Sequence, residues 1–96
     1  MKFTNDALIN GTSLKGHIVT TYGELVEKFG EPDFIGGDKT TVEWALEFED
    51  GTVATIYDWK YYETPMHKTE WNIGGKNSDA VFRVYEVMGL MEEQND

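Results

Sequence analysis

Residues 71–80, WNIGGKNSDA, place two glycines and a lysine directly before an expected helix start, a pattern that could hold a phosphate group. Free backbone N–H groups at a helix start attract anions. A nucleoside-triphosphate loop, however, needs four residues between its glycines and a hydroxyl residue directly after its lysine. Here the glycines are adjacent, Asn77 follows Lys76, and Asp79 in the first helical turn would repel a phosphate. The stretch therefore favours a turn followed by a capped helix, with an anion site as the alternative.

A second candidate for ligand chemistry is the aromatic run at residues 57–62, YDWKYY. Rings interleaved with a lysine can stack a base or a nucleotide ring. Tyr57 and Trp59 are also expected to face the core of a hairpin, so core packing is the default interpretation. The alternative is a pocket, either within one chain or across a homo-oligomer interface, that sequesters a small host nucleotide signal. Its lining would comprise Trp59, Lys60, Trp71, Gly74, Gly75 and Lys76.

Metal and hydrolytic sites lack their usual residue sets. The sequence has no cysteine, which excludes disulfides and thiolate zinc sites, and only His17 and His67 supply imidazole groups. Pro65 breaks the helical spacing that would bring His67 together with Glu63 and Glu70. Neither histidine has an evident serine or aspartate partner, and no nucleophile elbow is present. We therefore predict a protein without a metal, a cofactor or an enzymatic activity.

Charge is the strongest compositional signal. Eighteen acidic and eight basic residues give a formal net charge of -10. Binding to a phosphate backbone needs clustered Lys and Arg, so direct contact with nucleic acid is not expected. An acidic surface suits a basic partner instead, including a nucleic-acid-binding protein whose groove it could occupy. The alternative is that the acidity serves solubility alone.

The length of the chain and the content of its ends suggest one small intracellular domain. The 96 residues are 40% apolar and 14% aromatic, which is enough to form a single core. No apolar run approaches the roughly 18 residues that span a bilayer, and the first ten residues lack the apolar segment of a signal peptide. We expect one domain over residues 1–96, frayed at residues 92–96, in a reducing host cytoplasm and without membrane contact.

The clearest predicted element is a β-hairpin over residues 41–60, TVEWALEFEDGTVATIYDWK. Two runs of alternating apolar and polar residues flank Asp50-Gly51, which is typical of a two-residue type I′ turn. That turn would set Trp44 opposite Tyr57 on an aromatic-rich face turned toward the core. Cross-strand pairs of this kind stabilise a sheet by roughly 0.2–1 kcal/mol each.

The opposite face of this hairpin is predicted to be acidic. The same turn would set Glu43 opposite Asp58, a carboxylate pair that Lys39, Lys60 or a cation from a partner should offset. Like charges on one strand face repeat about every 6.6–7 Å, close to the separation of successive phosphates in a nucleic-acid strand. We therefore expect this face to enter a basic groove of a partner protein. The residues predicted to do so are Glu43, Glu47, Glu49 and Asp58.

Two helices and further strands complete the expected fold. Residues 21–30, TYGELVEKFG, predict a helix that begins with a capping box of Thr21 and Glu24 and ends at a glycine. Residues 67–75 predict a strand with Trp71 and Ile73 on one face, and Ser78 should cap a closing helix. Residues 14–20 read as a strand or an extended lead-in. The expected class is α+β, an antiparallel sheet of three or four strands with two helices packed on one face.

The segments SLKGHIVTTYGELVEKFGEP, DKTTVEWALEFEDGTVATIYDWK and WNIGG, taken in this order, resemble a family of small proteins encoded by bacteriophages. The resemblance covers roughly residues 12–84 and departs from the family pattern at Lys15, His17 and Asn72. It implies a phage accessory protein but no particular activity.

Together with the charge, the resemblance leads us to expect a non-enzymatic inhibitor of a host factor, such as a restriction nuclease or a CRISPR effector. Nucleotide sequestration is the runner-up. A structural or regulatory phage protein with neither activity remains the third alternative.

Overall fold

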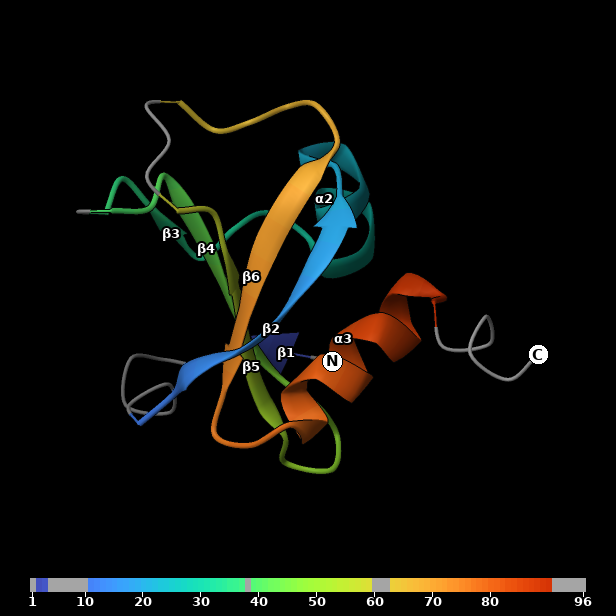
Figure 1. Cartoon of the computed structure of the whole chain (residues 1–96). Helices are drawn as coiled ribbons and strands as arrows, with labels where there is room; N and C mark the ends of the chain where they lie inside the picture. Colours follow the sequence, from blue (N-terminus) through green and yellow to red (C-terminus); the bar gives the residue numbers. More distant parts are fainter. Residues whose placement is uncertain (1, 4–10, 38, 60–62, 91–96) are drawn as a thin grey trace.

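The computed structural model describes residues 2–3, 11–37, 39–59 and 63–90 of the chain (Figure 1). It confirms the α+β class, with two helices on one face of an antiparallel sheet, while the sheet has more strands than the three or four predicted. Lys60 and the predicted frayed end at residues 92–96 lie outside the described residues. The described elements are β1 (Lys2–Phe3), β2 (Ser13–Thr20), α2 (Tyr22–Phe29), β3 (Phe34–Ile35), β4 (Val42–Glu47), β5 (Val53–Tyr57), β6 (Thr69–Gly75) and α3 (Asp79–Met88). The strand order is β1-β4-β5-β6-β2, with β3 also paired to β4.

The turn of the β4–β5 hairpin is one residue longer than predicted. The Phe48 N–H donates to the Thr52 carbonyl (2.9 Å), and the Gly51 N–H donates to the Phe48 carbonyl (2.9 Å). Gly51 has a φ of 89°, the left-handed conformation that ends a three-residue hairpin loop. Asp50 reinforces the loop, because its Oδ1 accepts the Thr52 N–H at 3.0 Å. The predicted two-residue type I′ turn is therefore wrong.

The extra loop residue shifts the register by one and reverses the faces of β5. Trp44 pairs with Ile56, and Glu43 pairs with Tyr57. Because side chains alternate along a strand, a shift of one residue sends every side chain of β5 to the other side of the sheet. The prediction that Tyr57 and Trp59 pack in the core is wrong: Trp59 is 47% exposed and Tyr57 is half-buried.

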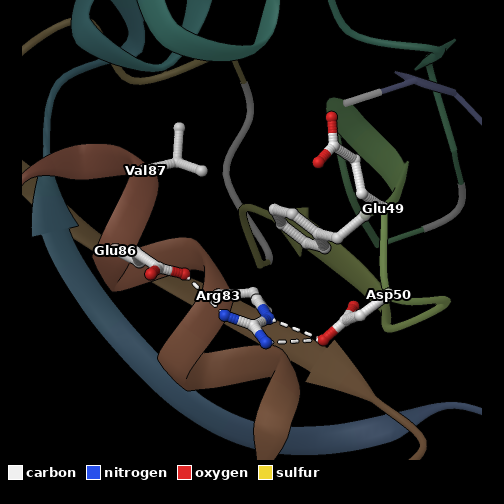
Figure 2. Close-up of a pocket in the computed structure, with 6 residues that line it drawn as sticks. Glu49, Asp50, Arg83, Glu86 and Val87 are labelled. Carbon is white, nitrogen blue, oxygen red and sulfur yellow. Dashed lines mark hydrogen bonds and ion pairs between the residues drawn. The ribbon is translucent and has the colours of Figure 1, made fainter.

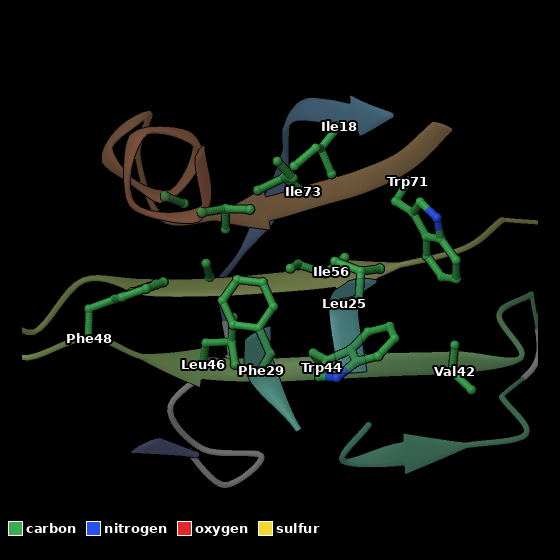
Figure 3. Close-up of a cluster of buried hydrophobic side chains, with 13 residues drawn as sticks. Ile18, Leu25, Phe29, Val42, Trp44, Leu46, Phe48, Ile56, Trp71 and Ile73 are labelled. Atoms are coloured by element: carbon green, nitrogen blue, oxygen red, sulfur yellow. The ribbon is translucent and has the colours of Figure 1, made fainter. Parts of the chain in front are cut away.

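The core lies between the sheet and the two helices (Figure 3). Trp44 and Trp71 meet edge to face with ring centroids 5.8 Å apart, and Tyr22 of α2 packs on Trp44. Both indole N–H groups have partners: Trp44 Nε1 donates to the Gly30 carbonyl (2.8 Å) and Trp71 Nε1 to the Thr20 carbonyl (3.2 Å). The two tryptophans thus attach the sheet to the backbone on either side of α2. The predicted common face of Trp71 and Ile73 is confirmed, since both are fully buried.

Helix α2 begins as the sequence predicts. Thr21 Oγ1 accepts the Glu24 N–H (3.1 Å), and Glu24 Oε1 accepts the Thr21 N–H (3.3 Å), which completes the capping box. The helix ends at Phe29, and Gly30 follows with a φ of 83°.

The start of α3 explains the paired glycines of residues 71–80. Gly75 lies under α3, where a Cβ would come within 2.4 Å of the Ala80 Cβ, so only glycine permits this close approach of helix and strand. Ser78 occupies the N-cap position, as predicted, but its side chain makes no capping bond. The side chain of the preceding residue supplies one instead, since Asn77 Oδ1 accepts the Asp79 N–H at 2.9 Å.

The edge of β4 is paired, and the outer edge of β2 is interrupted. Beyond β4, the short strands β3 and β1 pair with its two halves, and Asp33 Oδ2 accepts the Ala45 N–H (2.8 Å) between them. At the other edge, the register of β2 shifts around Lys15, and the Tyr85 hydroxyl of α3 donates to the His17 carbonyl (2.7 Å). Short strands, bulges, lysines and covering side chains are the usual means by which proteins block edge-to-edge pairing.

Candidate functional site

The candidate site is the face of the sheet turned away from α2 and α3, here called the outer face. The register and the alternation of side chains assign its members among the described residues. They are Leu14, His17, Val19, Glu43, Ala45, Glu47, Val53, Thr55, Tyr57, Trp59, Glu70, Asn72 and Gly74.

Four of these residues form a polar row across four neighbouring strands. Glu43 on β4 lies opposite Tyr57 on β5, which lies opposite Asn72 on β6, which lies opposite His17 on β2. Directly opposed side chains on one face have Cβ atoms about 5 Å apart, so neighbours in the row are within contact distance. The row brings together residues from positions 17 to 72 that sequence spacing does not connect.

The neighbouring row of the outer face has small residues on its three central strands, β4, β5 and β6. Ala45 lies opposite Thr55, and Thr55 lies opposite Gly74. A Cβ on Gly74 would come within 2.5 Å of Thr55 Oγ1, so the glycine is required by this close contact. Thr55 and Gly74 line a depression beside the polar row, and Thr55 is only 2% exposed at its base.

Tyr57 and Trp59 form an aromatic corner above this depression. Their ring centroids are 6.3 Å apart and their planes meet at 68°. The two rings line both a depression of about 630 Å³, shared with Leu14, His17, Glu70 and Asn72, and a depression of about 210 Å³, shared with Thr12, Ser13, Thr40, Glu43, Thr55 and Gly74. Among the described residues, Glu70 is the carboxylate that lines the larger depression, beside the His17 imidazole, and Glu43 is the carboxylate that lines the smaller one.

The electrostatics of the corner favour a cationic ligand. Burial, followed by the negative charge of Glu43, raises the pKa of the Tyr57 hydroxyl above its usual value. The phenol therefore stays protonated at neutral pH and remains a hydrogen-bond donor. Carboxylates on both sides of the rings would repel a phosphate, whereas the negative ring faces attract a cation.

The predicted acidic residues divide between the two sides of the sheet. Glu43 and Glu47 lie on the outer face, half-buried, and Glu49 is exposed in the hairpin loop. Asp58 is on the helix side and only 1% exposed, so it cannot contact a partner, and that prediction is wrong. The predicted pairing of Glu43 with Asp58 is also wrong, because Glu43 lies opposite Tyr57.

Asp58 has a structural role instead, as a buried hydrogen-bond acceptor. Its Oδ1 accepts the Thr41 N–H (2.8 Å) and the Val42 N–H (3.2 Å), and its Oδ2 accepts the Thr41 hydroxyl (2.7 Å). The Thr41 hydroxyl also lies 2.7 Å from the Thr64 hydroxyl. Asp58 thereby joins the end of β5 to the start of β4 and, through Thr41, to the segment that leads into β6.

The predicted nucleotide pocket does not assemble. Trp71 is fully buried in the core and Gly75 lies under α3, whereas Trp59 and Gly74 line a depression on the outer face. Lys76 is exposed at the turn between β6 and α3. The described members of the predicted set thus lie on both sides of the sheet and do not surround one ligand within a single chain.

A third depression, of about 380 Å³, lies beside the hairpin loop (Figure 2). Arg83 of α3 donates from Nε (2.9 Å) and Nη2 (2.6 Å) to Asp50 Oδ2, and from Nη1 to Glu86 Oε1 (2.7 Å). The Thr52 backbone N–H, with a further contribution from Arg83, lowers the pKa of Asp50 to about 2. Because Arg83 is already paired with two carboxylates, it is poorly placed to bind an anion, and this depression is a weaker candidate than the outer face.

Other site types have no support in the part of the chain that the structure describes. There, no three His, Asp or Glu side chains are grouped as metal ligands, and neither helix is long and apolar enough to cross a membrane. Comparisons with protein-family models, with curated proteins and with solved structures found no match. The resemblance to phage proteins therefore stays a prediction.

Proposed function

We propose that this chain is a non-enzymatic phage accessory protein that binds and inhibits a basic host protein in the host cytoplasm, as an anti-CRISPR or anti-restriction factor would. The observation that carries the proposal is the outer face, where the exposed Trp59 ring, the half-buried Tyr57 ring and exposed aliphatic side chains lie among carboxylates. The net charge of -10 supports a basic partner, because charge complementarity accelerates encounter and selects the partner.

The composition of the outer face fits a protein partner. Leu14, Val19 and Trp59 are 50%, 55% and 47% exposed, although each belongs to a residue type that usually avoids water. Exposed apolar groups that gather on one face and are bordered by charge mark interaction sites. Tryptophan and tyrosine are also the residue types most often found at the energetic centre of protein interfaces. Glu43, Glu47 and Glu70 border these groups on β4 and β6.

The spacing of the carboxylates changes the expected mode of binding. Glu43 and Glu47 are separated by Ala45 on the same face, which corresponds to about 13 Å along the strand. Glu49, which would have extended the series, lies in the hairpin loop. The acidic residues therefore do not follow successive phosphates of a nucleic-acid strand, and binding through general charge complementarity is the better supported mode.

A matched pair of charge-reversal variants tests the proposal. Partners would be captured from a host lysate at low salt, and the affinity of the captured protein would then be measured at increasing salt. The double variant Glu43→Lys with Glu47→Lys should lose binding and inhibition. The control, Glu27→Lys with Glu31→Lys, carries the same charge change at two exposed positions in and just after α2 and should retain both. Undiminished binding by the outer-face variant, or equal loss in both variants, would contradict the proposed surface.

Nucleotide capture is not favoured, because the predicted pocket residues are divided between two faces and the exposed rings lie beside carboxylates. Calorimetry against a panel of cyclic and linear nucleotides provides the independent check. Submicromolar binding of one of them would overturn the proposal of a protein-binding inhibitor.

A further inference from the structure

We propose that the aromatic corner of Tyr57 and Trp59 is a receptor for an arginine side chain. The source of this arginine depends on the proposed function, since a basic host protein would supply it. The chemistry of the corner can nevertheless be tested with peptides alone.

The geometry of the two rings matches a planar cation. Because the planes of Tyr57 and Trp59 meet at 68°, a group that lies flat on one ring presents its edge to the other. A guanidinium is planar, stacks on aromatic faces and donates hydrogen bonds only from its edge. It can therefore stack on Trp59, which is half exposed, while its edge remains free to reach polar neighbours.

Acceptors lie where that edge would point. The β5–β6 pairing ends at Tyr57 and Asn72, and Trp59 and Glu70 both line the depression just beyond that pair. Glu70 and the Asn72 side chain both line the larger depression with the two rings. A carboxylate and an amide oxygen can accept from the guanidinium, and a pairing with Glu70 would be charge-assisted. The depression, at about 630 Å³, also leaves room for the residues that flank the arginine in a peptide.

Other ligands fit this arrangement less well. A stacked nucleotide would bring its phosphate close to Glu70 or Glu43, which line the two depressions. A lysine ammonium is compact and strongly hydrated, and it has no plane that could stack on one ring while presenting an edge to the other. Selectivity for arginine over lysine is therefore the signature that separates this receptor from a generally acidic surface.

Tryptophan fluorescence gives a direct readout, because Trp59 is exposed whereas Trp44 and Trp71 are fully buried. A blocked Arg-Gly-Arg peptide would be titrated at low salt, beside its Lys-Gly-Lys and citrulline analogues. We expect a saturable change in Trp59 emission with the arginine peptide, affinity several-fold weaker for lysine, and no saturation with neutral citrulline. In calorimetry, Trp59→Leu and Glu70→Gln should each weaken the arginine peptide about tenfold. Glu27→Gln on α2 is the charge-matched control and should leave the affinity unchanged.

The outcomes separate this inference from the proposed function. Equal binding of arginine and lysine peptides would overturn the receptor. So would an unchanged affinity of the Trp59→Leu variant, provided that its far-UV circular dichroism and its unfolding midpoint match those of the native protein. If a captured host protein binds Trp59→Leu normally but not the Glu43→Lys and Glu47→Lys double variant, the receptor is refuted while the inhibitor proposal stands. Selective arginine binding without any host partner would support the receptor and refute the inhibitor proposal.

Discussion

Removing the Asp58 side chain should destabilise the protein strongly, whereas changing its charge alone should not. In Asp58→Ala, the N–H groups of Thr41 and Val42 lose the acceptor that they share, Oδ1 at 2.8 and 3.2 Å. A buried N–H without a partner costs about 1–3 kcal/mol. Val42 is buried and incurs most of that cost, while Thr41 is half-buried and can recover part of it from water. We expect a loss of about 3 kcal/mol in the free energy of unfolding.

Asp58→Asn tests whether hydrogen bonding or charge carries this effect. The asparagine Oδ1 can still accept both N–H groups, and its Nδ2 would face the Thr41 hydroxyl, which now donates to Asp58. That hydroxyl can reverse its role by accepting from Nδ2 and donating to Thr64, whose oxygen lies 2.7 Å away. All partners are then satisfied, so we expect a loss of only about 1 kcal/mol or less.

Urea unfolding followed by near-UV circular dichroism measures both changes. With an m-value of about 1.5 kcal/mol/M, the alanine variant should unfold at a midpoint about 2 M lower, and the asparagine variant within about 0.7 M of the native protein. If the two variants were equally destabilised, the negative charge itself would be essential and the hydrogen-bond reasoning would be refuted. Because Asp58 is buried, Asp58→Asn should also leave partner binding unchanged.

Three further predictions concern the helices and the hairpin loop. Gly75→Ala should lower the free energy of unfolding by about 2 kcal/mol, because the new Cβ would lie 2.4 Å from the Ala80 Cβ. Ala80→Gly should cost about 1 kcal/mol alone, but in the double variant it should restore part of the stability that Gly75→Ala removes. Additive losses in the double variant would contradict this contact. Asp50 has a folded-state pKa of about 2, below its unfolded value near 4, so its stabilising contribution is complete above about pH 4 and is lost as the pH falls toward 2. Asp50→Asn should therefore flatten the acid limb of the stability curve in that interval, and superimposable acid titrations of the two proteins would show the reasoning to be wrong. Thr21→Ala should cost about 1 kcal/mol in thermal or urea unfolding by removing the capping box of α2, and an unchanged midpoint would show that tertiary packing alone holds the helix start.

Local signals in the sequence predicted most of the fold. The capping box of Thr21 and Glu24, the glycine after Phe29 and the alternation of β4 each reflect interactions between near neighbours, so they could be read without the tertiary structure. The short strands β1 and β3 were missed because two residues carry no periodicity, and only their pairing with β4 defines them.

The candidate site was predicted less well because it depends on one turn. Asp50-Gly51 is compatible with a two-residue turn, but Gly51 instead ends a loop that also includes Glu49. The register of the hairpin decides which half of β5 faces water, so this single difference exchanged Asp58 for Tyr57 and Trp59 on the outer face. The structural role of Asp58 could not be predicted from the sequence. Its carboxylate accepts hydrogen bonds from three donors in Thr41 and Val42, which lie 17 and 16 positions away along the chain.

The pairing and the side-chain contacts at the sheet edges restrict how two copies of this protein can associate. Among the described residues, β1, β3 and Asp33 lie alongside β4, and the irregularity at Lys15 and the Tyr85 hydroxyl interrupt the outer edge of β2. Ribbon-like growth by strand addition is thus discouraged, even though tryptophan and leucine side chains are exposed nearby. Stacking of two copies through their outer faces would in turn bring like-charged carboxylates together. Charge repulsion between identical outer faces therefore opposes this mode of self-association.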